Sequence, residues 1–338
     1  MDFLLSLPVF SYVATPMLNS WSASLNFLFF YITWATLVFT HSPLKIELVG
    51  TLAVRIVFWL VPSILFLLFD ALLPGLVQSI KLFGSVSTAP RSVPAQAKQT
   101  LLAIVNLALL TALQAAISTA VTSLLRRPPF KTSIALPLPW PLIKHIFALY
   151  AAREVLTYYI HRYILHSCGI ITRLHAQYAH ERKGAAPYSL LLYADHPLPL
   201  VFSHLVPVYL PSLVIRPHLL TYFLFTLLTT IEEMLSMSGY NVVPGIVMSS
   251  IAMRTATHYA SGGRGNYGVW GLLDCIHGTS VGKDTISYTR GKIKKPKVRV
   301  KREPVRRVIN TLREYVQDGT RSQKGTRKGR KTGYGKEQ

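Results

Sequence analysis

The chain has 338 residues, of which 50% are hydrophobic and 15% are charged, and its mean hydropathy is +0.34. This composition indicates a membrane protein and excludes a water-soluble globular domain. The formal net charge is +22, but residues 290–338 hold 18 Lys and Arg against 4 acidic residues, so most of the excess lies in a C-terminal tail.

Long apolar stretches predict the membrane helices. We expect transmembrane helices at about residues 21–40, 48–69, 100–125 and 140–160. Residues 70–99 are interrupted by Pro and Gly and are expected to form a loop. The apolar segment from residue 197 to 236 predicts a broken hairpin that enters the membrane and returns, because Pro199, Pro207 and Pro211 oppose one straight helix. The expected fold is an all-α integral membrane protein in which a histidine-rich helical cap lies outside the membrane.

We divide the chain into three parts: N-terminal membrane helices and a loop at 1–99, a metal-binding membrane domain at 100–288, and a basic, partly disordered tail at 289–338. Within the tail, residues 303–317 could form an amphipathic helix on the membrane. The tail lacks the interleaved aromatic residues that stack on bases, so it favours an anionic membrane surface over nucleic acid.

The basic tail also predicts the orientation of the chain. Positive charge next to membrane spans favours the cytosol, which places the tail and the histidines there. Arg126, Arg127 and Lys131 would then face the lumen, against the same rule. We retain the cytosolic assignment because the tail carries far more charge than these three residues.

Five of the eleven histidines lie between residues 154 and 196: His161, His166, His175, His180 and His196. Imidazole is a common ligand of transition metals, so this cluster predicts a metal site. The first four form two pairs with a spacing of five residues. On an ideal α-helix that spacing separates side chains by about 140°. Each pair can therefore reach one metal only if the helix ends or distorts between its members.

Other polar residues are candidates for additional ligands or for supporting roles. Asp195 precedes His196 and could orient a ligand imidazole, or it could cap a turn. Glu154, Glu232 and Asp274 are possible carboxylate ligands, while an ion pair is an equal alternative for Glu232. His258 and His277 complete the set. The Gly-rich segment 261–268 lacks a Walker lysine and a preceding strand, so we interpret it as a tight loop.

The order of these motifs resembles that of the fatty acid hydroxylase and sterol desaturase superfamily of integral membrane di-iron enzymes. "HRYILH" at residues 161–166 is similar to the first histidine box of that family, and "LHAQYAHE" at 174–181 to the second. "ADHPLP" resembles the following His-Pro step. "SGY" at 238–240, "GNYG" at 265–268 and "LD-x-x-x-GT" at 273–279 are similar to landmarks around and after the third box.

The resemblance implies oxygen-dependent hydroxylation or desaturation of a membrane lipid, either a sterol or a fatty acyl chain. It implies two iron ions held by His161, His166, His175, His180, His196 and His258, with electrons from NAD(P)H through cytochrome b5 or a reductase. It also implies a place in the endoplasmic reticulum.

The sequence departs from the family pattern at four positions. Ala179 stands where the second box usually has a histidine, Met237 stands before "SGY", and Arg254 and Thr255 replace histidines of the third box. A site with a single metal is therefore one alternative to two irons. Another alternative is a catalytically degenerate scaffold whose basic tail binds anionic lipid or a partner. Convergence of Glu154, Glu232 or Asp274 with the histidines would favour the enzyme, and its absence would favour the scaffold. A transporter is a weaker alternative, because no inverted repeat is visible.

Overall fold

The computed structural model describes residues 21–88, 92–167, 169–180 and 186–282. Within these ranges the chain is helical, and its β-structure consists of isolated bridges such as Lys131 to His218. The predicted all-α fold is confirmed. The expected tail helix at 303–317 and the predicted tail disorder lie outside the described residues.

The α-helices are α3 (Trp21–Thr40), α4 (Pro43–Arg55), α5 (Val61–Leu72), α6 (Pro74–Ile80), α7 (Val93–Leu125), α8 (Pro139–Tyr159), α9 (Gly169–Tyr178), α10 (Pro197–Leu200), α11 (Val206–Ile215), α12 (Leu219–Ser236), α13 (Ile246–Ala260) and α14 (Leu272–Ile276). Three π-turns, Ile56–Leu60, Ile160–Leu165 and Val201–Leu205, and two 3-10 turns, Gly84–Ser87 and Ser189–Leu192, join or follow them. Many helices begin with proline in the first turn, where the missing N–H costs nothing.

Four helices are long and apolar enough to cross a membrane: Pro43–Leu72, Val93–Leu125, Pro197–Ile215 and Leu219–Ser236. They include two of the four spans expected besides the hairpin, at 48–69 and 100–125. Both arms of the expected hairpin qualify, and the proline-rich arm is a helix with one π-turn at 201–205. The helix at 139–159 does not qualify, and in the first expected span the apolar helix is the shorter Ser24–Thr40. The predicted loop at 70–99 also contains α6 and the first turn of α7.

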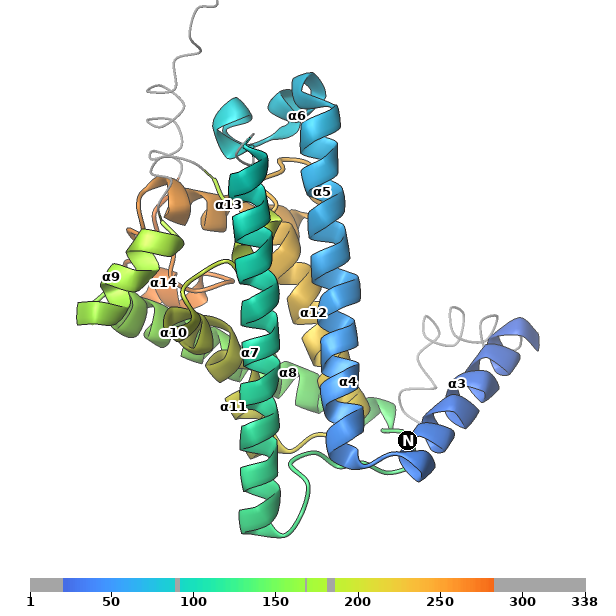
Figure 1. Cartoon of the computed structure of the whole chain (residues 1–338). Helices are drawn as coiled ribbons and strands as arrows, with labels where there is room; N and C mark the ends of the chain where they lie inside the picture. Colours follow the sequence, from blue (N-terminus) through green and yellow to red (C-terminus); the bar gives the residue numbers. More distant parts are fainter. Residues whose placement is uncertain (1–20, 89–91, 168, 181–185, 283–338) are drawn as a thin grey trace, which may run out of the picture. The chain divides into compact units, whose positions relative to one another are not determined.

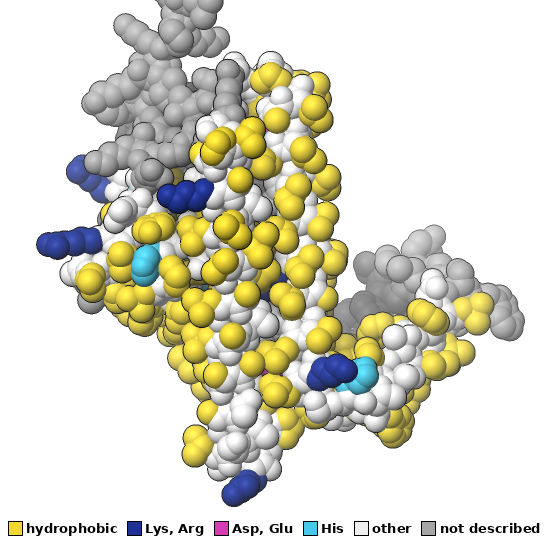
Figure 2. Space-filling model, in the orientation of Figure 1, with side chains coloured by type: hydrophobic (Ala, Val, Ile, Leu, Met, Phe, Trp, Pro, Cys, Tyr) yellow, Lys and Arg dark blue, Asp and Glu magenta, His cyan; other side chains and the backbone are white. Residues whose placement is uncertain are grey.

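In Figure 1, α7 runs beside the continuous rod of α4 and α5, while α9, α13 and α14 gather on the other side of α7. Hydrophobic side chains cover the visible faces of α4, α5 and α7 in Figure 2, and Lys and Arg lie toward the edges of this surface. Exposed side chains such as Phe58, Leu65 and Leu109 would be costly in water. Such a surface suits contact with lipid acyl chains.

Helix α12 lies at the centre of the packing, where it contacts α4, α8 and α13. Its residues Leu219, Tyr222 and Phe225 are fully buried, and the Tyr222 ring stacks on Phe130 at 4.3 Å. A polar group also joins the spans, because the Glu47 carboxylate of α4 accepts hydrogen bonds from α7 and from Tyr209 of α11. These contacts fix the spans that support the histidine-rich side of the molecule.

Candidate metal centre

The first histidine pair lies where α8 changes into a π-turn. His161 is within the turn Ile160–Leu165, and the His166 N–H donates to the His161 carbonyl at 3.1 Å. This i to i+5 hydrogen bond widens the helix, so side chains five residues apart come to the same side. The five-residue spacing of His161 and His166 predicted a distorted helix, and the distortion is this π-turn.

The second pair meets the same requirement differently. His175 is in the last turn of α9, and His180 follows the end of that helix at Tyr178. The chain is thus free to turn the His180 ring back toward His175, and their ring centres lie 5.0 Å apart.

Five histidines from three parts of the chain converge on one region. Ligand atoms of His161, His166, His180 and His258 all lie within 4.8 Å of one another. The His175 ring lies 5.0 to 5.6 Å from the rings of His180, His166 and His161. Box one, box two and the last turn of α13 therefore contribute to a single group, which we call the histidine group.

The Nε2 atoms of these five histidines are buried without a hydrogen-bond partner. The Nδ1 atoms of three of them face acceptors: His161 faces the Tyr267 carbonyl at 3.1 Å, His258 the Gly265 carbonyl at 2.7 Å, and His175 the Asp195 carboxylate at 2.8 Å. A carbonyl can only accept, so Nδ1 carries the hydrogen and Nε2 presents its lone pair. Buried nitrogens without partners are costly unless an ion binds them.

Burial also keeps the imidazoles of His161, His166, His180 and His258 uncharged. It lowers the pKa of His166 to about 2 and that of His258 to about 4, and it holds the pKa values of His161 and His180 well below their usual range. Proximity to the other imidazoles lowers the pKa values further. Neutral imidazole is the form that coordinates metals, so the group is prepared for a cation.

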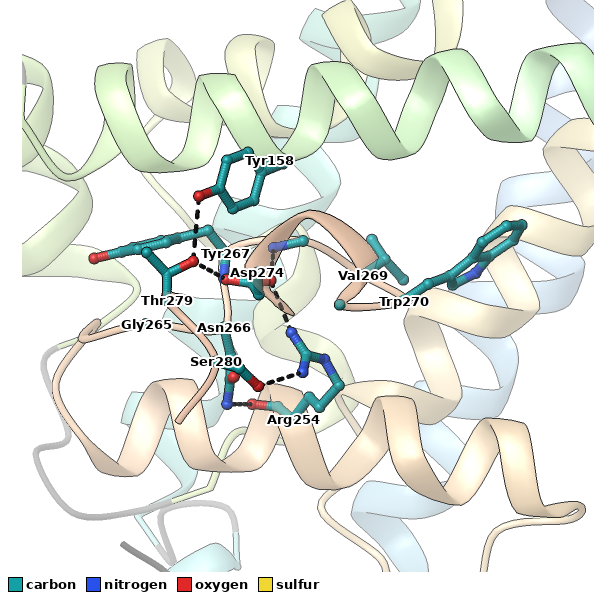
Figure 3. Close-up of polar contacts among 12 residues, drawn as sticks. Tyr158, Arg254, Gly265, Asn266, Tyr267, Val269, Trp270, Asp274, Thr279 and Ser280 are labelled. Carbon is teal, nitrogen blue, oxygen red and sulfur yellow. Dashed lines mark hydrogen bonds and ion pairs between the residues drawn. The ribbon is translucent and has the colours of Figure 1, made fainter. Parts of the chain in front are cut away.

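The loop that supplies the two carbonyls is held by two buried carboxylates. Asp274 accepts hydrogen bonds from the backbone N–H groups of Tyr267 and Gly268, from the Thr279 hydroxyl and from Arg254 (Figure 3). Glu154 accepts from the N–H groups of residues 269, 270 and 271. These contacts fix the backbone of residues 265–271 against α8 and α13.

Comparison with known families agrees with this arrangement. Residues 146–279 match the family model described as fatty acid hydroxylase. The chain carries a fatty acid hydroxylase domain. The match includes all five members of the histidine group and the loop that orients two of them. No solved structure matches the chain.

Several candidate residues of the hydroxylase domain lie outside the histidine group. His196 caps α10, where its Nδ1 accepts from the Leu198 N–H at 3.2 Å. His277 is exposed and stacks on Tyr158. Glu232 pairs with Arg153 at 2.8 Å. Glu154 and Asp274 hold the loop, so the structure brings none of these carboxylates to the histidines, while Asp195 contacts one of them.

The positions at which the hydroxylase domain departs from the usual histidine pattern gather around one cavity. Ala179, Met237 and Thr255 all line a cavity of about 140 Å³ together with His161, His175 and His258. Arg254 instead forms a 2.7 Å ion pair with Asp274. At these three positions the cavity is therefore bordered by side chains that are poor ligands for iron.

The sequence pattern does not reveal the contacts that support the histidine group through backbone carbonyls. The carbonyls of Gly265 and Tyr267 orient His258 and His161, and backbone acceptors are not visible in a sequence. Asn106 of α7, outside the matched range, donates to the carbonyls of Tyr193 and Asp195 at 2.8 and 2.7 Å. A lone asparagine in an apolar helix is the one feature that could have indicated this contact.

Proposed function

We propose that this protein is a membrane-embedded, iron- and oxygen-dependent enzyme that hydroxylates or desaturates a lipid chain. The observation that carries the proposal is the convergence of five histidine rings, whose buried Nε2 atoms have no hydrogen-bond partner, beside a largely apolar cavity. The fatty acid hydroxylase domain supports the same class of reaction.

The residues present fit a bound transition metal. His161, His166, His175, His180 and His258 would hold it through Nε2, and imidazole suits iron among the first-row metals. Iron in such a site supplies the activation of dioxygen for attack on an unactivated C–H bond. Asp195 and the carbonyls of Gly265 and Tyr267 orient the rings from behind.

The cavity beside the histidine group suits a lipid chain. Its apolar lining includes Ile160, Leu191, Phe202 and Val269. It also reaches both arms of the membrane hairpin, at Phe202 and at Met237 just after α12. A chain that is dissolved in the bilayer can therefore approach the histidines without crossing water, and the apolar walls exclude water from the reacting carbon.

The proposed reaction needs an external reductant. In hydroxylation, a C–H bond, dioxygen, two electrons and two protons yield an alcohol and one water. In desaturation, two neighbouring C–H bonds, dioxygen, two electrons and two protons yield an alkene and two waters. The electrons would come from NAD(P)H through cytochrome b5 or a reductase that binds at the membrane surface.

We place the protein in the endoplasmic reticulum, with the histidine group and the tail on the cytosolic side. The reductase would then bind from the cytosol. The opposite ends of the spans hold Arg126, Arg127, Lys131 and Arg216, which oppose this orientation by the charge rule. Labelling of single cysteines placed at residue 127 and in the tail, in intact microsomes, tests it. Reagent that does not cross membranes should label only the tail cysteine, and the reverse pattern would reject the orientation.

Activity is tested by lipid analysis of cells that express the wild-type chain or His161→Ala under isotopically labelled dioxygen. We expect a lipid that carries a new labelled hydroxyl, or a new double bond, in wild-type cells only. His277→Ala is the matched control, since His277 is exposed and lies outside the histidine group. A lipid profile that is identical in all three strains would reject the proposal.

A catalytically inactive membrane scaffold is the second candidate. It is favoured by one observation, which is that Glu154, Glu232 and Asp274 do not join the histidines but bind the loop or Arg153. For this function the tail would bind anionic lipid or a partner, and the identical lipid profiles just described would be its expected result.

A further inference from the structure

The five rings of the histidine group have a definite arrangement. Four of them form a closed cycle of neighbours, with ring centres 5.6 Å apart for His161 and His175, 5.0 Å for His175 and His180, 4.9 Å for His180 and His258, and 4.6 Å for His258 and His161. The fifth ring, His166, lies 4.9 to 5.2 Å from every member of the cycle.

The ring centres are arranged as in a square pyramid with His166 at its apex, and the ligand atoms of the apex and of three base rings lie within 4.8 Å of one another. Rings bound at right angles to one ion, with metal–nitrogen distances of about 2.1 Å, have centres about 4.7 Å apart, and opposite rings are about 6.6 Å apart. The eight neighbouring distances lie close to the first value. Among the described residues, the two diagonal pairs, His161 with His180 and His175 with His258, are not in ring contact, as expected for opposite ligands.

The open side of the pyramid faces the cavity. The cavity is lined by three rings of the base, His161, His175 and His258, and not by His180 or the apical His166. A ligand position opposite His166 therefore points into the space where a lipid chain would lie. Five protein ligands and one open position together make the six positions of a single six-coordinate ion.

Beyond the histidine group, the described cavity wall offers Asp195, His204 and Glu233 as metal-ligating side chains, and each of them already contacts another protein group. Asp195 binds His175 and the His196 N–H, and Glu233 pairs with Arg153 at 2.8 Å and lies 3.4 Å from His204. The Ser203 and Ser236 hydroxyls donate to backbone carbonyls. Arg153 at the same wall is paired with Glu232 and Glu233, so it competes with a metal for the Glu233 carboxylate.

We propose that this chain binds one transition-metal ion through five histidines, with His166 as the apical ligand, and has no second metal position among the residues that the structure describes. The proposal rests on the proposed function only in that both require a metal at the histidine group. It differs from the two-iron site that the sequence resemblance implies.

Stoichiometry tests the proposal without any activity measurement. The full-length protein is purified in detergent, stripped with a chelator and titrated with Co(II), with visible absorption and EPR as readouts. We expect saturation at one equivalent and the EPR signal of an uncoupled ion. His180→Ala should weaken binding at least tenfold, and His196→Ala should leave it unchanged. Saturation at two equivalents, a coupled pair, or no binding by folded protein would overturn the proposal.

The role of His166 as the apical ligand is tested separately by substituting two neighbouring glycines, Gly262 and Gly263. A Cβ atom at Gly263 would meet the His166 ring at 2.3 Å, whereas one at Gly262 would meet nothing within 4 Å. Both residues have positive φ, 84° and 71°, so the backbone strain of an alanine is matched. We expect Gly263→Ala to weaken Co(II) binding at least tenfold relative to Gly262→Ala and to change the absorption bands. Equal affinities and spectra would reject His166 as a ligand.

The two proposals fail separately. One Co(II) per chain without any oxidised lipid would reject the enzymatic function and keep the single site. Two Co(II) per chain together with an oxidised lipid would keep the function and reject the single site.

Discussion

The Nδ1 atom of His175 lies 2.8 Å from the Oδ2 atom of Asp195, and both side chains are buried. The second oxygen of the same carboxylate accepts the His196 N–H at 2.6 Å, which fixes its orientation. A carboxylate in this place selects the tautomer that leaves Nε2 free and increases the basicity of that nitrogen. The segment after the second histidine box thus supports the metal centre without contributing a ligand.

Asp195→Asn should therefore weaken metal binding while the histidines remain in place. Substitution of residues that support ligands typically costs about 10- to 100-fold in affinity, and we expect a loss in that range by Co(II) titration. His196→Ala is the control, because it removes the neighbouring imidazole but keeps Asp195. An unchanged affinity in Asp195→Asn would mean that the contact does not orient the ligand.

Glu154→Gln should loosen the loop that carries the orienting carbonyls. The amide places N–H groups against the backbone donors of residues 269–271, so at least one buried hydrogen bond is lost, at about 1–3 kcal/mol. We expect a lower Tm in detergent and weaker Co(II) binding. Glu232→Gln is the matched variant, since its carboxylate pairs with Arg153 and touches the loop only through the Trp270 indole N–H at 3.5 Å, without binding the loop backbone. Glu232→Gln should lower Tm without changing Co(II) affinity. Equal Co(II) affinities in the two variants would contradict the role of Glu154.

These roles show how far the sequence alone reaches. Histidine spacing and motif order predicted the all-α membrane class and four of the residues that converge with His258, because these signals are local. The use of Glu154 and Asp274 was not predictable, since both bind backbone N–H groups of a distant loop. The expected span at 140–160 does not qualify because Lys144, His145, Arg153 and Glu154 make α8 too polar. The prolines after residue 197 do not end the helix there, since it continues through a π-turn.

The stability of the metal-free protein should fall in acid. In the folded state burial lowers the pKa values of His161, His166, His180 and His258, whereas the unfolded chain titrates near 6.5. Below that pH the unfolded state binds protons that the folded state excludes, so the free energy of unfolding decreases with pH. The contribution of His258 levels off below about 4.

The pH effect is measured as the Tm of chelator-treated protein between pH 7.5 and 5. Each histidine adds a slope of up to about 1.4 kcal/mol per pH unit, so His166→Gln should flatten the profile by about that amount. A Tm that does not change across this range would show that these imidazoles are accessible to protons in the folded protein.

The contact between α7 and the site gives the last prediction. Asn106 is fully buried in a membrane span, and its amide donates to the carbonyls of Tyr193 and Asp195. Asn106→Leu leaves both carbonyls without this donor in a low-dielectric region, at about 1–3 kcal/mol for each group. The segment that holds Asp195 would then shift to find other donors, and His175 would lose its orientation.

We therefore expect Asn106→Leu to lower both Tm and Co(II) affinity, and to lower the affinity no further when it is combined with Asp195→Asn, because both changes act through the same imidazole. Gln114→Leu is the control. Gln114 is equally buried in α7, but its amide binds Glu47, far along the helix from the site. It should lower Tm alone, and an additive loss of affinity in the double variant would show that Asn106 acts on the metal centre by another route.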